Sequence, residues 1–191
     1  MEQTFPADIV ALESAFEATE RDARRLIDGL SETLGTWRPH AGSWSVAECL
    51  DHLATSNIVY LRALEPPAER ALAAGRLRRG PAVPGFFGSW FVRWFEPPVR
   101  SKAEAPEKIR PRESPSLHDA ADRFLASQDE IRAFTRRYHR IDLAGTTFPN
   151  PFIRGVRFSL ATGLHVLAAH ARRHLWQAWR VREAAVAGVA A

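Results

Sequence analysis

The sequence predicts an all-α protein, a four-helix bundle with a long Pro-rich crossover connection between helices 2 and 3. Two observations lead to this prediction. Apolar residues recur at spacings of three and four in four separate segments, which is the period of one helix face. Prolines and glycines recur between the second and third of these segments. With 191 residues, of which 46% are hydrophobic, the chain is expected to form a single domain, 1–191, around one core.

The first helix is expected over about residues 8–34, where apolar residues recur on one face. Gly35 follows the last of them and is expected to end the helix, since glycine adopts the left-handed conformation common at helix ends. The second helix is expected over about residues 46–64 or longer. Ser45 precedes it and Glu48 follows three residues later, which is the pattern of a capping box.

An irregular connection is expected over about residues 65–115, with one short helix at most. It contains an aromatic cluster, Phe86 to Phe95, whose i, i+4 spacings favour a packed hydrophobic lid or plug over a membrane-docking surface. The third helix is expected over about residues 116–138. The fourth and longest is expected over about residues 157–185, and no strand-like alternation of useful length is apparent.

Composition excludes several function classes. The net charge of +4 comes from arginines interleaved with acids, as on solvated helix faces, so no nucleic-acid partner is expected. No stretch approaches the roughly 20 apolar residues that cross a bilayer, and the N-terminus lacks a signal-peptide pattern, so no membrane partner is expected. Cys49 is the only cysteine, which is compatible with a reducing compartment. We therefore expect a cytoplasmic protein.

Two histidines stand on the apolar stripe of the fourth segment. His170 and His174 are four residues apart, so their rings share one helix face. Buried imidazoles need a partner for their nitrogens, and a metal ion can be that partner. A third ligand is expected from His52, which lies between Leu50 and Leu53 in the second segment. His165 falls on the opposite side of its helix.

The same histidines have an alternative interpretation. An H-x-x-x-H pair arises often by chance, and by itself it favours two partly exposed or hydrogen-bonded histidines on an Arg-rich helix. The addition of His52 by periodicity leaves the two interpretations evenly balanced. A catalytic residue is not identifiable from the spacing.

Two segments resemble a known family. Residues 37–53, WRPHAGSWSVAECLDHL, and residues 170–177, HARRHLWQ, are similar to the two signature segments of the DinB-like superfamily. The resemblance implies a four-helix bundle that binds one divalent transition metal, zinc or nickel, through His52, His170 and His174. It also implies a site-lining role for Gln177. Ala171 stands where zinc proteases carry their general base, which argues against peptide hydrolysis.

Other residues near these histidines are candidates for lining the site. Glu48 precedes His52 by one turn and could orient its ring, although its position three residues after Ser45 favours the capping role. Ser56 and Tyr60 follow His52 on roughly the same face. Cys49 could approach the metal, but a lone cysteine in a helix core is usually an inert hydrophobic residue.

The resemblance also implies a function. Members of the DinB-like superfamily include transferases that use a low-molecular-weight thiol such as mycothiol or bacillithiol, and a maleylpyruvate isomerase. The expected function is therefore a metal-dependent thiol S-transferase, with a small-molecule thiol and an electrophile as partners. The alternative is a non-catalytic metal-binding stress or interaction module. Either protein could form a homodimer through its bundle faces.

Overall fold

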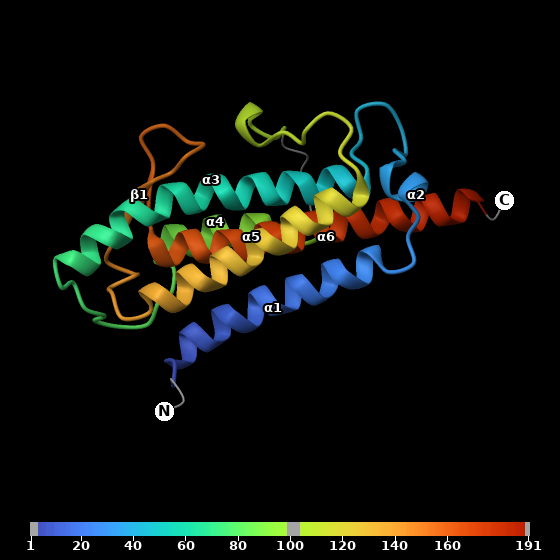
Figure 1. Cartoon of the computed structure of the whole chain (residues 1–191). Coiled ribbons are helices and arrows are strands. Elements are labelled where there is room, and N and C mark those ends of the chain that lie inside the picture. The colour runs from blue at the N-terminus through green and yellow to red at the C-terminus, as the bar shows by residue number, and fades with distance from the viewer. Residues whose placement is uncertain (1–3, 99–103, 190–191) are drawn as a thin grey trace.

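A computed structural model describes residues 4–98 and 104–189 as a bundle of long helices (Figure 1). The long helices are α1 (Ala7–Ile27), α3 (Val46–Ala73), α5 (Leu117–Tyr138) and α6 (Leu160–Val189). The short elements are the helices α2 (Glu32–Thr36) and α4 (Phe86–Phe95), the 3-10 helix η1 (Glu107–Ile109) and the strands β1 (Thr147–Pro149) and β2 (Arg157–Ser159). The all-α fold class predicted from the sequence is confirmed.

The long connection sets the directions of the helices. Helices α1 and α6 run one way along the bundle and α3 and α5 run the other way (Figure 1). Parallel neighbours such as α3 and α5 cannot be joined by a tight turn, so the chain must travel back along the bundle between them. It does so through α4, which packs on α6, and η1, which packs on α3.

The first helix is shorter than predicted. The sequence favoured one helix over residues 8–34, but α1 ends at Ile27 and α2 begins at Glu32. Gly29 between them has a φ of 65°, a left-handed conformation that ends a helix. Ser31 then caps α2 by accepting a hydrogen bond from the amide of Leu34 at 3.3 Å. The left-handed turn therefore comes at Gly29, and Gly35 lies inside α2.

Helix α3 extends beyond the two prolines that were expected to begin the connection. Pro66 and Pro67 lie inside it, and the helix continues to Ala73. Proline in a helix interior removes a backbone hydrogen bond at a cost of about 3 kcal/mol. Pro67, Ala68 and Ala71 are buried, so packing of this last part of α3 against the core offsets that loss.

A small hairpin precedes α6 and was not predicted. Strands β1 and β2 pair antiparallel, with Phe148 opposite Phe158, in the region where the sequence suggested only a loop and the start of the last helix. Phe148 is fully buried and packs against Gly163 of α6. A Cβ atom at Gly163 would come within 2.9 Å of the Phe148 ring and of Leu64, so glycine is needed for this close contact.

No helix in the described part of the chain is long and apolar enough to cross a membrane.

The apolar interior forms two adjoining clusters along the bundle. One is centred on Phe16, Leu64 and Leu164. The other is centred on Leu50, Phe124 and Leu175.

The capping box at the start of α3 is confirmed and can be tested. The Ser45 hydroxyl accepts from the Glu48 amide at 3.1 Å, and Glu48 accepts from the Ser45 amide at 2.9 Å. Ser45→Ala should lower the free energy of unfolding by about 1 kcal/mol. The Glu48 amide loses its hydrogen-bond acceptor, and the hydrogen bond from the Ser45 amide to Glu48 loses its favourable geometry. Urea denaturation measures the change.

Ser14→Ala is the matched control, because Ser14 is exposed in the interior of α1. It should change the free energy of unfolding by less than about 0.5 kcal/mol. Equal effects of the two substitutions would contradict the role of the cap.

Candidate metal centre

The antiparallel packing of α3 and α6 brings three histidines together. His52 comes from the beginning of α3, and His170 and His174 come from one face of α6. One potential ligand atom from each ring lies within 4.8 Å of the others. His52 is 1% exposed and His170 is 9% exposed, while His174 is partly buried. The three residues predicted from the sequence therefore form one cluster.

In the His52 and His174 rings, a hydrogen bond to a neighbouring group holds the Nδ1 atom. Nδ1 of His52 donates a hydrogen bond to the backbone oxygen of Ile109 in η1, at 2.5 Å. Nδ1 of His174 donates to the side-chain oxygen of Gln177 at 3.0 Å. Both contacts place the proton on Nδ1 and leave Nε2 unprotonated, which is the form of imidazole that binds a metal.

The sequence predicted Gln177 but not Ile109. The resemblance to the DinB-like superfamily implied a site-lining role for Gln177, which lies one turn after His174. Ile109 contributes a backbone carbonyl from a segment 57 residues away from His52. A carbonyl has no side-chain signal, so sequence reasoning could not select it.

Burial keeps the three imidazoles neutral. It lowers the pKa of His52 from 6.5 to about 4, against the opposing effect of the hydrogen bond to Ile109. Burial also lowers the pKa values of His170 and His174 well below the usual value, and the positive charges of neighbouring groups, Arg173 among them, lower both further. Neutral rings at pH 7 are ready to act as ligands, since no proton must be displaced.

The nitrogen geometry fits a divalent transition metal. Nε2 of His52 and Nε2 of His170 face each other at 3.2 Å. Two nitrogens bound to one tetrahedral zinc ion at 2.0–2.1 Å would be about 3.3 Å apart. His52 and His174 are also close, with ring centroids 4.5 Å apart. Three imidazoles could therefore hold one ion, with at least one coordination position left for another ligand.

Aromatic rings cover the cluster from two sides. Trp44, which precedes α3, lies 4.7 Å from the His52 ring and 5.7 Å from the His174 ring, centroid to centroid. Phe95 at the end of α4 contacts the His170 ring edge to face at 5.4 Å. Phe95, the last residue of the aromatic cluster, thus contributes to one wall of the site. These rings limit the access of water to the three nitrogens. Phe86, Phe87 and Trp90 of α4 are exposed, so the cluster as a whole is not the packed lid that the spacing favoured.

A buried carboxylate next to His52 anchors the connection. Asp51 is fully buried and accepts hydrogen bonds from the backbone amide and the Nε atom of Arg112, both at 2.8 Å. Arg123 of α5 also pairs with it. These contacts fix the chain three residues after Ile109, so the carbonyl that orients His52 is held in place. Sequence analysis did not single out Asp51, although an acid among apolar residues of α3 was a signal.

The other predicted lining residues have different partners. Glu48 caps α3 and forms a two-point ion pair with Arg38, so its carboxylate is engaged away from the rings. Ser56 is buried one turn after His52. The Tyr60 ring packs against the Phe148 ring at 5.9 Å, beside the hairpin. Site-lining roles for these residues stay predictions.

Cys49 and His165 lie outside the cluster. Cys49 is fully buried, and burial raises the pKa of its thiol, so it is an inert core residue. Nε2 of His165 lies 3.1 Å from the backbone oxygen of Ala82, in the connection. Among the described residues, the one group of histidines, cysteines and acids that could hold a metal is His52, His170 and His174.

Comparison with known protein families agrees with this geometry. The family model described as the DinB superfamily matches residues 15–178. The chain belongs to the DinB superfamily. The match includes the three histidines, the whole of α3 and α6 as far as Ala178. Searches of the curated proteins and of the solved structures found no match.

Burial of three neutral histidines predicts how the stability of this DinB-superfamily protein depends on pH. Below about pH 6.5 the unfolded chain takes up protons on these rings, whereas the folded chain does not until about pH 4 at His52. The metal-free protein should therefore lose stability as the pH falls from 6.5 toward 4. Each histidine contributes up to about 1.4 kcal/mol per pH unit.

Urea denaturation at half-unit steps of pH, with a chelator present, measures this slope. His52→Gln should make the slope shallower. His118→Gln, at an exposed position of α5, is the control and should not change it. A free energy of unfolding that is constant from pH 7 to pH 5 would show that the histidines are not buried as described.

Proposed function

We propose that this protein is a metal-dependent transferase that uses a low-molecular-weight thiol. The observation that carries the proposal is the buried group of three neutral imidazoles, with Nε2 of His52 3.2 Å from Nε2 of His170. Three nitrogen ligands leave at least one coordination position of the ion open, as in catalytic rather than structural metal sites. Membership of the DinB superfamily supports the same class of function.

A bound zinc or nickel ion would supply a positive charge that stabilises a thiolate at neutral pH. The residues of the chain have separate tasks. His52, His170 and His174 would hold the ion. The Ile109 carbonyl and the Gln177 side chain keep the Nδ1 protons of two rings in place, which orients Nε2 toward the ion. Trp44 and Phe95 exclude water from one side of each ring that they contact.

The alternative is a binding module without turnover, and one observation separates both of these candidates from a hydrolase. In the described part of the chain, the hydrogen bonds of the three rings go to a carbonyl, to an amide oxygen and between the rings, and none goes to a carboxylate. A hydrolytic mechanism would need a general base close to the metal. A thiol transferase does not need one, because the thiolate itself is the nucleophile.

Two further properties belong to the same proposal. A cytoplasmic location would keep thiol cosubstrates reduced, and the chain has only one cysteine, Cys49, which is free. A homodimer could form through bundle faces, and sedimentation equilibrium would measure it.

Metal content gives the first test. The purified protein, with any affinity tag removed, should contain close to one zinc or nickel ion per chain by elemental analysis. His170→Ala should weaken metal binding by more than about 100-fold. Removal of a group that only orients a ligand already lowers metal affinity by about 10- to 100-fold, and removal of the ligand itself should lower it further.

His165→Ala is the matched control, because it removes a histidine from the same helix outside the cluster. It should leave the metal content unchanged. Metal bound equally by wild type and His170→Ala would locate the ion elsewhere.

The second test measures turnover. Metal-loaded protein is mixed with mycothiol or bacillithiol and with an alkylating bimane as the electrophile. A transferase joins the thiol sulfur to the electrophilic carbon while the thiol loses its proton and the carbon releases its halide, so both compounds should disappear together at a rate proportional to bound metal. His174→Ala should abolish this rate. A metal-loaded wild type that consumes neither compound would favour the binding module.

A further inference from the structure

A second polar site lies at the end of the bundle away from the histidines. Two adjoining cavities, of about 370 and 680 Å³, share Arg76, Gly145 and Thr146 in their walls. Arg70 of α3 lines the larger cavity. At 1.5 Å per residue, Arg70 is about 27 Å farther along α3 than His52. These cavities therefore do not belong to the candidate metal centre.

The walls of these cavities are strongly basic. Arg76 and Arg79 line the smaller cavity, and neither has an ion-pair partner within the described residues. Arg157 contributes a third guanidinium to the larger cavity. Asp142 is the one acid in the walls of either cavity. The sum of these charges attracts an anion.

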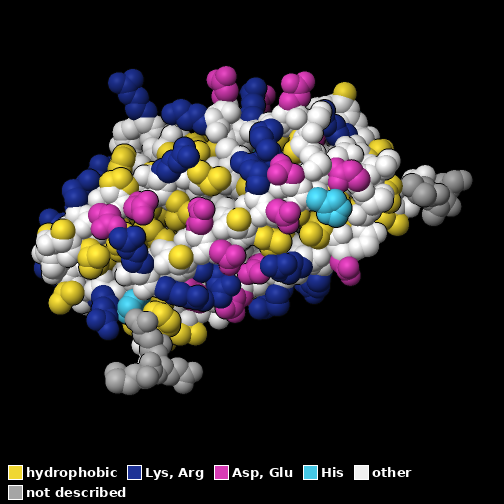
Figure 2. Space-filling model, viewed as in Figure 1, with side chains coloured by type: hydrophobic (Ala, Val, Ile, Leu, Met, Phe, Trp, Pro, Cys, Tyr) yellow, Lys and Arg dark blue, Asp and Glu magenta, His cyan; other side chains and the backbone are white. Residues whose placement is uncertain are grey.

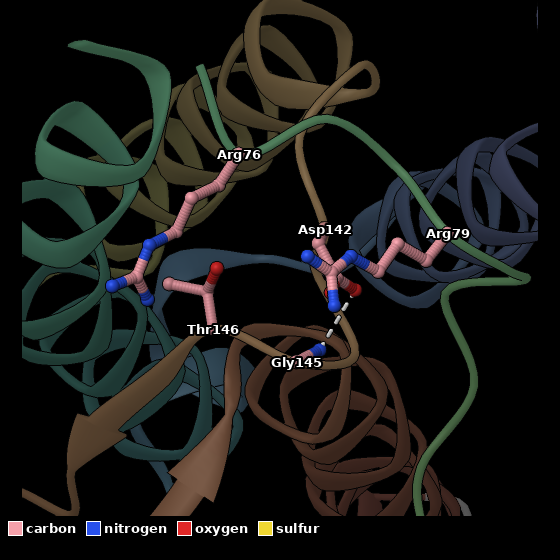
Figure 3. A pocket seen from close by; sticks show the side chains of 5 residues that line it. All are labelled: Arg76, Arg79, Asp142, Gly145 and Thr146. Carbon is pink, nitrogen blue, oxygen red and sulfur yellow. Dashed lines mark hydrogen bonds between the residues drawn. The ribbon is translucent and has the colours of Figure 1, made fainter. Parts of the chain in front are cut away.

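A buried hydroxyl without a partner lies among these charges. Thr146 is 5% exposed, and its Oγ1 atom has no hydrogen-bond partner. Figure 3 shows this oxygen directed into the space between the side chains of Arg76 and Arg79. An unpaired hydroxyl is unfavourable in a protein interior, because it has lost its bonds to water. A ligand in the cavity would supply the missing partner.

Backbone contacts hold this site in a fixed arrangement. The amide of Asp142 donates to the oxygen of Arg76 at 2.9 Å, and the amide of Thr146 donates to the oxygen of Asp142 at 2.9 Å. The Asp142 side chain accepts from the amide of Gly145 at 2.9 Å, as drawn in Figure 3. The two segments that carry Arg76 and Thr146 are thus joined to each other. A ligand would find them already in place, which favours binding.

We propose that this cavity binds the phosphate group of a small molecule. Guanidinium groups bind phosphate oxygens through paired N–H donors, and two arginines with one hydroxyl offer donors for three oxygens of one phosphate. A carboxylate has only two oxygens and would leave one of these groups without a partner. The cavity exceeds the size of a phosphate ion, so it leaves room for the rest of a phosphorylated metabolite.

Calorimetric titration with inorganic phosphate tests the proposal, at constant ionic strength maintained with chloride. The wild type should bind phosphate in a saturable manner. Arg76→Gln and Thr146→Val should each weaken binding by about tenfold or more, because each removes one hydrogen-bonded group. Thr146→Val keeps the shape of the side chain and removes an unpaired hydroxyl, so the folded state should be at least as stable as that of the wild type.

Two control variants separate a specific site from general attraction. Arg62→Gln removes an exposed arginine of α3 that does not line either cavity, and phosphate binding should not change. Asp142→Asn removes the negative charge but keeps an oxygen for the Gly145 amide, and phosphate should bind more tightly. Absence of saturable binding, or equal weakening by Arg62→Gln and Arg76→Gln, would overturn the proposal.

Discussion

The burial of three imidazole rings between α3 and α6 is the constraint on which the rest of this structure depends. A buried ring that is not paired with a suitable partner destabilises the fold. The chain satisfies His52 with the Ile109 carbonyl, and it satisfies His174 with Gln177. The remaining Nε2 atoms of His52 and His170 face each other. A metal ion could bind to these nitrogens, and it would then be the partner that all three rings share.

The irregular connection is part of the site rather than a passive link. It is attached at one point by Glu96, which pairs with Arg172 of α6 at 2.5–2.9 Å. It is attached at another by Arg112, which binds the buried Asp51 of α3. Between these two points it supplies the carbonyl that orients His52. A bundle made only of the four long helices would lack this control over the tautomer of His52.

The two ends of the bundle differ in chemistry. Two aromatic rings, Trp44 and Phe95, contact the histidines at one end, whereas arginines line an open polar cavity at the other. Arg76 and Arg79 of the connection line a cavity at the end of the bundle away from the histidines. Figure 2 shows lysines and arginines interspersed with acids over one face of the molecule, without a continuous basic surface.

Local periodicity was sufficient to predict the four long helices, the cap at Ser45 and the shared face of His170 and His174, because each depends on residues within a few positions of one another. The sequence did not determine the break at Gly29 or the continuation of α3 through Pro66, since both depend on packing that competes with local preference. Only the tertiary structure decided which backbone carbonyl orients His52, where Asp51 finds its arginines, and that Thr146 faces an arginine-lined cavity. These contacts join segments distant in the sequence, and their atoms leave no periodic signal along it.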